Sequence, residues 1–270
     1  MPPVSVSPGF LNRNNMALTL YPLQGLPLVN PGDDLSGLII DSLQKNNHSM
    51  KSGDILVIAQ KIISKAEDRF VNLTTVTPSE QAEKFANLTG KDPRLVELIL
   101  SESAEVLRTR QNMMIVAHTL GFVCANAGID HSNVSGPWGD ADDWVLLLPV
   151  DPDESARIIR AALEKEFQCE IGVLVIDSHG RAWRQGTAGV AIGISGMPGL
   201  VDLRGKPDLF DFQLKVTQVA AADELASAAS LVMGQAKEGL PVVLVKGFPY
   251  PLREGSLQEL IRPKELDLFR

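Results

Sequence analysis

Three short, continuous apolar runs constrain the fold of this chain more than any other feature. They are Ile55–Ala59 and residues 171–176 and 241–245. Each run is too short to cross a membrane and lacks the alternation of a half-exposed strand, so each is typical of a strand buried on both faces. Helical patterns lie between the runs. This mixture predicts an α+β (mixed α/β) fold.

The spacing of apolar and capping residues predicts the helices. Asp34 is the expected N-cap of a first helix, and another helix spans residues 151–167. Thr77 is the expected N-cap of a helix over residues 78–88, which a helix over residues 93–107 follows. The other expected elements are strands at 18–23, 113–117 and 122–125, a helix at 223–233, and a Gly- and Ala-rich segment at 186–199 that favours close backbone packing.

Composition excludes several classes of protein. The formal net charge of −8 argues against nucleic acid as the main partner, but a few lysines and a bound cation can still neutralise a triphosphate. Cys124 and Cys169 form no Cys/His cluster, so no structural zinc site is expected, and two buried thiols suit a reducing cytoplasm. Residues 1–16 have no secretory signal pattern and are interpreted as a loose leader, with Met16 as an alternative start.

Two lysines follow the first buried strand directly. Gln60, Lys61, Ser64 and Lys65 lie where α/β proteins commonly present binding groups, and the lysines are suited to phosphate oxygens. The alternative is an amphipathic connection with solvated lysines. No Walker loop is present.

The loop of residues 126–134 is polar after an apolar strand. Asp130 could bind a hard cation such as Mg²⁺ or Mn²⁺, which prefers oxygen ligands. The alternative is an Asx-type turn, in which Asn and Asp bond to nearby backbone. His131 is interpreted as a neighbour and not as a ligand, because hard cations seldom choose imidazole.

A third polar stretch begins at Asp177, which follows a buried run and is expected at the tip of its strand. Ser178 and His179 come next, but we expect neighbours at a strand end to point in divergent directions. Because no Gly-x-Ser-x-Gly elbow is present either, a hydrolase triad is not expected. On pattern alone, residues 234–239 are a helix end and a turn.

Taken together, these stretches resemble the coenzyme F420-0:L-glutamate ligase family. The similarity runs from Leu18 to about Glu259. It rests on Gly25-Leu26-Pro27, on residues 54–67 with Ile63-Ser64-Lys65-Ala66-Glu67, on residues 126–134 and 177–181, on Trp183-Arg184-x-Gly186, on residues 191–196 and on Ala222-Asp223-Glu224.

The resemblance implies a cytoplasmic enzyme that uses GTP to add L-glutamate to the carboxylate of F420-0 through an acyl phosphate, giving F420-1 and longer γ-linked forms. It also implies a ligase-like domain over residues 17–270, built from two lobes, and an intertwined homodimer. Two divalent ions, Mg²⁺ or Mn²⁺, are expected; whether K⁺ assists stays open. No nucleic acid or membrane partner is expected.

The resemblance also assigns residues to the site. The expected catalytic residues are Asp130, Asp177 and Lys65, and the expected metal ligands are Asp130, Asp177, Ser178 and Gln235. The expected GTP-binding residues are Leu26, Pro27, Leu28, Val29, Gln60, Lys61, Lys65, Asn133, Met233, Gly234, Gln235, Ala236, Lys237, Glu238, Gly239 and Leu240.

Two departures from the family pattern keep alternatives open. Gln235 stands where the family often has a metal-binding glutamate, so the second metal site is expected to be weaker or to be supported by Glu238. Residues 210–212 stand where many relatives have Gly-Arg. The alternatives are a diverged amide ligase for another carboxylate and a nucleotide-binding protein without catalysis. Because the chain ends at Arg270, the C-terminal flavin-binding domain of some relatives is expected to be absent, and no FMN should bind.

Overall fold

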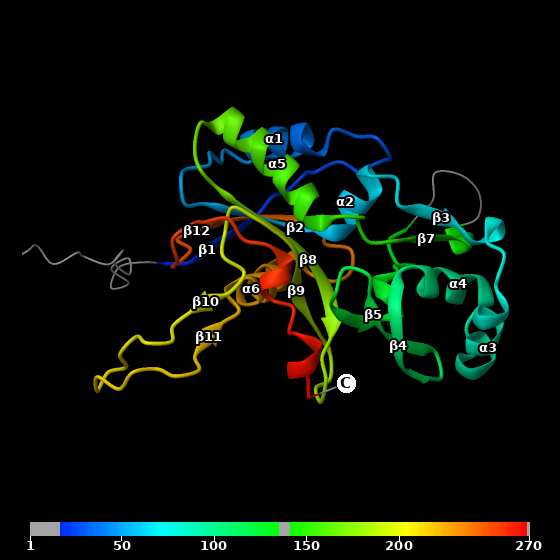
Figure 1. The fold of residues 1–270 in the computed structure, drawn as a ribbon. Coiled ribbons are helices and arrows are strands. Elements are labelled where there is room, and N and C mark those ends of the chain that lie inside the picture. The colour runs from blue at the N-terminus through cyan, green and yellow to red at the C-terminus, as the bar shows by residue number, and fades with distance from the viewer. Residues whose placement is uncertain (1–16, 135–140, 269–270) are drawn as a thin grey trace, which may run out of the picture.

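A mixed five-stranded sheet forms the centre of the computed structural model, which describes residues 17–134 and 141–268 (Figure 1). The expected leader lies outside these residues. In spatial order the strands are β1 (Thr19–Pro22), β12 (Val242–Lys246), β2 (Ile55–Ala59), β8 (Gly172–Gly180) and β9 (Thr187–Ser195). Only β2 and β8 run parallel; the other neighbours in this sheet are antiparallel. The predicted mixed α/β class is confirmed.

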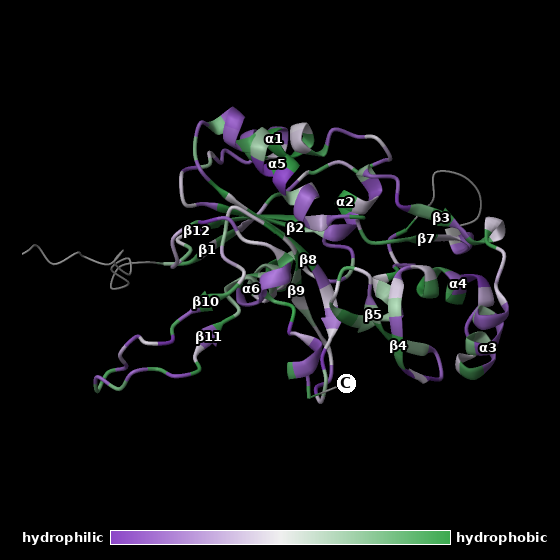
Figure 2. Cartoon of the chain, in the orientation of Figure 1, coloured by the Kyte–Doolittle hydropathy of each residue, from purple (hydrophilic) through white to green (hydrophobic). Residues whose placement is uncertain are grey.

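Helices cover both faces of this sheet, which explains the continuous apolar runs. Leu56 and Ile58 of β2 face a core shared with α1 (Leu35–Lys45) and α5 (Pro152–Phe167), which lie together on one side in Figure 1. Ile55 and Val57 face a second core built around α6 (Ala221–Met233). Figure 2 shows the mostly hydrophobic strands of the sheet between helices in which hydrophilic and hydrophobic residues mix.

Local capping signals set most helix starts but misplace one. Asp34 caps α1, as predicted, by accepting a hydrogen bond from the backbone N–H of Gly37. The prediction of Thr77 as a cap is wrong, because α3 (Glu80–Thr89) begins two residues later. The Ser79 hydroxyl accepts from the N–H of Ala82, and this bond satisfies an otherwise free amide in the first turn.

The helix predicted over residues 93–107 is also too long. The helix α4 (Pro93–Ser101) ends at Ser101, and β4 (Ser103–Arg110) follows at once as the antiparallel partner of β5 (Met113–His118). Partner-strand hydrogen bonds satisfy the backbone of residues 103–110, so the pairing overrides a local helical pattern.

The remaining elements form smaller units around the sheet. Together with α3 and α4, the β4–β5–β6 sheet encloses a third hydrophobic cluster, and β10 and β11 form the base of an extended arm (Figure 1). The predicted division into two lobes and the homodimer stay predictions. The remaining bounds are α2 (Gln60–Ala66), β3 (Phe70–Asn72), β6 (Val123–Ala125), β7 (Trp144–Leu146), β10 (Val201–Asp202), β11 (Gln218–Val219) and the 3₁₀ turns η2 (Leu73–Thr75), η3 (Asn126–Gly128), η4 (Ala141–Asp143), η5 (Leu257–Glu259) and η6 (Lys264–Leu266).

Two further sequence expectations meet the structure here. Cys124 is buried and burial raises the pKa of its thiol to about 12, whereas Cys169 is only half-buried, contrary to expectation. Among residues 17–134 and 141–268, no helix combines the length and apolarity needed to cross a membrane.

The glycine-rich strand β9 gives a test of the packing. A Cβ at Gly193 would lie 2.4 Å from the carbonyl oxygen of Pro152, the first residue of α5, and neither backbone can move freely. We expect Gly193→Ala to lower the free energy of unfolding by about 2 kcal/mol or more in urea titrations. Gly180→Ala, at the end of β8 where a Cβ meets open space, is the control. Equal losses in both variants would contradict the packing argument.

Candidate active site

One cleft of about 880 Å³ gathers every residue that the sequence analysis assigned to the site. The assigned residues come from five separate segments of the chain. These segments contribute Leu26, Pro27, Leu28 and Val29; Gln60, Lys61 and Lys65; Asp130 and Asn133; Asp177 and Ser178; and Met233, Gly234, Gln235, Ala236, Lys237, Glu238, Gly239 and Leu240.

The parallel pairing of β2 and β8 brings the first two polar stretches together. Ala59, the last residue of β2, lies opposite Ile176 of β8, so Gln60 and Asp177 follow side by side at the same edge of the sheet. On α2, Lys61 and Lys65 are one helical turn apart and point the same way. Lys61 Nζ contacts Asp130 and Lys65 Nζ donates to the carbonyl of Asn133, so both ammonium groups have partners in the 126–134 loop.

Side chains from α2 hold Asp130 in place. Gln60 Nε2 donates to Asp130 Oδ2 at 2.6 Å, and Lys61 Nζ lies 2.7 Å from Asp130 Oδ1. The Ser64 hydroxyl donates to Gln60 Oε1 at 2.8 Å and orients that amide. Asp130 also exchanges two backbone hydrogen bonds with Leu146. Its carboxylate therefore faces the cleft, and the Asx-turn alternative is wrong for this residue.

The electrostatics of the cleft are balanced between acidic and basic groups. Burial raises the pKa of Asp130; Lys61 opposes this shift, and the negative charge of Asp177 adds to it. Burial together with the neighbouring Lys61 lowers the pKa of Lys65. Each ammonium group therefore partly neutralises a site that two nearby carboxylates would otherwise make strongly negative.

Asp177 lies inside β8 and not at its tip, because the strand continues to Gly180. Residues two apart on a strand share a face, so His179 points the same way as Asp177, and the expectation of divergent neighbours is wrong for this pair. His179 Nε2 lies 3.0 Å from Asp177 Oδ2. Burial raises the pKa of Asp177, but the His179 contact and other interactions outweigh burial and leave that pKa below its usual range.

A column of three rings supports this contact. Phe122 lies between two histidines: its ring centroid is 5.3 Å from that of His118 and 5.2 Å from that of His179. His118 and Phe122 belong to β5 and the turn after it, whereas His179 belongs to the main sheet. Ring packing therefore couples the smaller sheet to the position of Asp177.

The loop after α6 closes the other side of the cleft. Gln235 Oε1 accepts a hydrogen bond from the Ser178 hydroxyl at 2.8 Å, and Asn133 Nδ2 donates to the carbonyl of Ala236 at 3.3 Å. Glu238 Oε2 accepts from the N–H of Ala236 at 2.8 Å. These bonds connect the loop to β8 and to the 126–134 loop.

The donor set suits a divalent ion that nucleotide phosphates help to bind. Within the described residues, no three His, Cys, Asp or Glu side chains converge as a metal cluster. Two carboxylates, Asp130 and Asp177, face one cleft, and Ser178 and Gln235 add neutral oxygens. Mg²⁺ typically takes one or two protein carboxylates and completes its shell with water and phosphate oxygens.

Comparison with known proteins shows the family of the chain. A family model described as F420-0:gamma-glutamyl ligase matches residues 25–247. The chain belongs to this family. The coenzyme F420:L-glutamate ligase of Methanothermobacter thermautotrophicus is 46% identical over 257 residues, which cover 94% of this chain and 100% of that protein. Proteins of the same name from Methanocaldococcus jannaschii and Methanosarcina mazei are 43% and 36% identical, over 91% and 92% of this chain and 94% and 93% of theirs.

Sequence reasoning missed part of the site of this ligase-family chain. It left out His179, although a spacing of two residues within a strand is a signal that it shares a face with Asp177. It gave no role to Phe122, whose ring contacts depend on packing between two sheets. His131 was not expected to be a metal ligand, and its Nε2 lies 3.0 Å from the carbonyl oxygen of Asp142.

The ring column predicts a pH-dependent stability. Burial lowers the pKa of His118 to about 4, so its 3.9 Å contact with Glu102 is not an ion pair at neutral pH. In the unfolded chain His118 takes up a proton as the pH falls below about 6.5, whereas in the folded chain it does so only near pH 4. The contribution of His118 therefore lowers the free energy of unfolding by roughly 3 kcal/mol as the pH falls from about 6.5 to about 4.

Urea titrations between pH 7 and pH 4 measure this effect. His118→Asn, which keeps an acceptor near the N–H of Leu120 that Nδ1 now binds, should flatten the pH dependence. His131→Gln, a change at an exposed histidine, serves as the control and should keep it. Identical slopes in wild type and His118→Asn would contradict the assignment.

Proposed function

We propose that this chain is a GTP-dependent ligase that joins L-glutamate to the carboxylate of F420-0 by an amide bond, giving F420-1 and longer γ-linked forms. The main observation behind this proposal is that Asp130, Asp177, Lys61 and Lys65 all line one cleft. Family membership and the names of the relatives support the substrates. Joining two anions, a carboxylate and a triphosphate, requires cations between them.

The nucleotide is proposed to occupy the cleft between α2 and the loop after α6. Lys61 and Lys65 supply point charges for its phosphates. The segments 26–29 and 233–240 lie on the walls of the cleft. A cleft of about 880 Å³ falls within the range of volumes that small-molecule sites occupy.

Asp130 and Asp177 are proposed to hold two divalent ions, Mg²⁺ or Mn²⁺, with Ser178 and Gln235 as weaker oxygen ligands. When bound, such ions lower the repulsion between the triphosphate and the acceptor carboxylate. Lys61, which contacts Asp130, must turn from that carboxylate toward phosphate when the site fills. Gln60 remains to orient Asp130.

The proposed reaction has two steps. An oxygen of the acceptor carboxylate attacks the γ-phosphorus of GTP, the bond to the β-phosphate oxygen breaks, and an acyl phosphate and GDP form. The glutamate amine then attacks the acyl carbon, inorganic phosphate leaves with the electron pair, and the nitrogen loses a proton. Lys65, whose position is set by a 3.0 Å hydrogen bond to the carbonyl of Asn133, orients phosphate oxygens.

The second candidate, a diverged ligase for another carboxylate, depends on the changes at Gln235 and at residues 210–212. Gln235 lies in the cleft, where its oxygen already accepts from Ser178. Phe210 and Phe212 lie exposed in the arm between β10 and β11, and neither belongs to the described lining of the cleft. The arm therefore gives no reason to change the substrate, and Gln235 is the remaining basis for this alternative.

The direct test incubates the protein with F420-0, L-glutamate, GTP and Mn²⁺ and reads the products by mass. We expect a mass increase of one glutamate residue, and of two or more at long times, with GDP formed in equal amount. GTP turnover with a different acid but not with F420-0 would support the diverged ligase. Nucleotide binding without any turnover would support the non-catalytic alternative.

Asp177→Asn tests the carboxylate at the centre of the site. The amide keeps the shape of the side chain but loses the charge that a divalent ion requires, so kcat should fall at least about a hundredfold. Mn²⁺ binding, measured by calorimetry with a GTP analogue, should weaken in parallel. Asp41→Asn, at an exposed position on α1, is the matched control. Near wild-type activity in Asp177→Asn would refute the metal assignment.

A further inference from the structure

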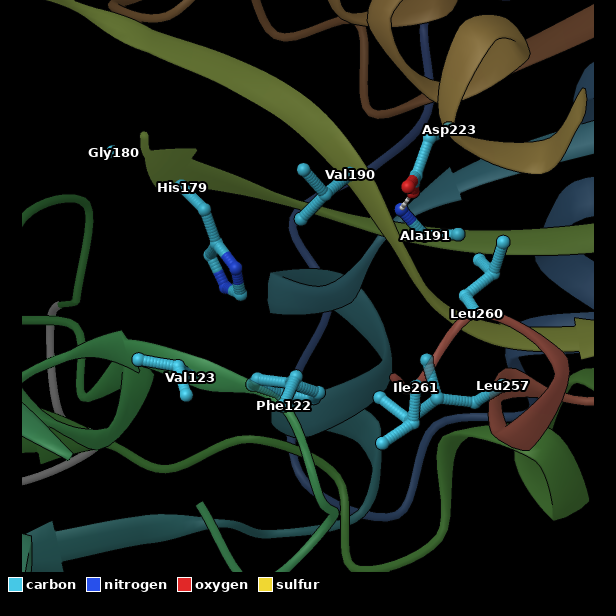
Figure 3. A pocket seen from close by; sticks show the side chains of 10 residues that line it. All are labelled: Phe122, Val123, His179, Gly180, Val190, Ala191, Asp223, Leu257, Leu260 and Ile261. Atoms are coloured by element: carbon cyan, nitrogen blue, oxygen red, sulfur yellow. Dashed lines mark hydrogen bonds between the residues drawn. The ribbon is translucent and has the colours of Figure 1, made fainter. Parts of the chain in front are cut away.

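A second, smaller pocket lies beside the cleft and has no role in the proposed nucleotide site. Its volume is about 200 Å³, and its walls come from β6, β8, β9, α6 and the segment around η5. His179 and Gly180 line both cavities. Figure 3 shows the His179 ring directed toward Phe122, with Val190 and Asp223 beyond it. The pocket therefore adjoins the residue that contacts Asp177.

The side chains that line this pocket are apolar except at two positions. Phe122, Val190 and Ile261 are among the apolar residues, and His179 and Asp223 are the ionisable ones in the described lining. The apolar surface suits methylene groups. A carboxylate in such surroundings is costly, and a hydrogen bond from Ala191 and the nearby His179 offset only part of that cost for Asp223.

Asp223 is held so that one oxygen stays available. Its Oδ1 accepts a hydrogen bond from the N–H of Ala191 at 2.9 Å, shown in Figure 3. Within the described chain, Oδ2 has no hydrogen-bond partner. Burial raises the pKa of Asp223, which reflects the cost of keeping this charge half-buried. A bound ammonium group would offset that cost through a charge-assisted hydrogen bond.

The size of the pocket limits the ligand. Its volume is below the range of about 300–1,000 Å³ typical for drug-sized molecules. A nucleotide or a deazaflavin ring system therefore does not fit, whereas a free amino acid does. Arg181 follows Gly180, Arg262 follows Ile261, and both arginines are exposed. Neither arginine belongs to the lining of the pocket, and Arg181 Nη2 donates to the carbonyl of Gln185 at 3.2 Å.

We propose that this pocket, which His179 separates from Asp177, is the subsite for the amino-acid substrate, in which Asp223 binds the α-ammonium group of L-glutamate. The assignment rests on the proposed ligase function and adds the position of its amine substrate. It gives a role to Asp223 and Ala191, which belong to two family-like motifs, 191–196 and 222–224, that the nucleotide cleft leaves unused.

Selectivity for an amine tests the role of Asp223. Binding of L-glutamate and of glutarate, which lacks the amine, is measured by calorimetry with Mn²⁺ and a non-hydrolysable GTP analogue present. Wild type should bind glutamate at least about tenfold more tightly than glutarate. Asp223→Asn, which keeps an acceptor for Ala191, should lose this preference. Glu224→Gln, the exposed neighbour on α6, is the control and should keep it.

A second variant fills the pocket without touching Asp223. Val123 lines the pocket and is 38% exposed, so Val123→Phe adds volume from the rim. The KM for glutamate should rise at least about tenfold, while the KM for GTP stays unchanged. An unchanged glutamate preference in Asp223→Asn, or no glutamate binding to wild type, would overturn the subsite. The mass of the product tests the ligase function separately. If Asp223→Asn forms the product and keeps the preference for glutamate over glutarate, the subsite is overturned but the ligase function is not.

Discussion

The parallel pairing of β2 with β8 is the constraint on which the site depends. Parallel neighbours need a long crossover, and here the crossover carries the third hydrophobic cluster, the 126–134 loop and α5. Because Ala59, the last residue of β2, pairs with Ile176, α2 begins beside Asp177 of β8, which continues to Gly180. The same crossover returns Asp130 to this edge. Loss of the pairing would separate the groups that the cleft brings together.

Contacts between side chains hold the two carboxylates of this edge in place. Lys61 and Gln60 contact Asp130, and His179 contacts Asp177, so each carboxylate has a partner of its own. The partners differ in kind. The ammonium group of Lys61 ends a flexible side chain and can turn toward a phosphate, whereas the ring of His179 packs against Phe122 and is held in place. The site thus combines a carboxylate with a movable counterion and one with a fixed partner.

Glycines in β9 allow helices to approach both faces of the sheet closely. A Cβ at Gly189 would lie 2.5 Å from the carbonyl of Ala226 on α6, and one at Gly193 would meet the start of α5. The predicted close packing of the Gly- and Ala-rich segment is confirmed. It brings α6 near enough for Asp223 to bond to the backbone of β9, and it fixes the start of the loop that closes the cleft.

The sequence by itself determined the buried strands, the cap of α1 at Asp34 and the polar residues that follow β2. These depend on local pattern, because burial on two faces requires an uninterrupted apolar run and a cap requires a side chain within three residues. Tertiary structure alone decided that β4 is a strand, that Asp130 faces Lys61 and not its own turn, and that the Phe122 ring packs against His179. Each of these needs a partner far away in the chain, and local spacing carries no information on which distant residue will supply it.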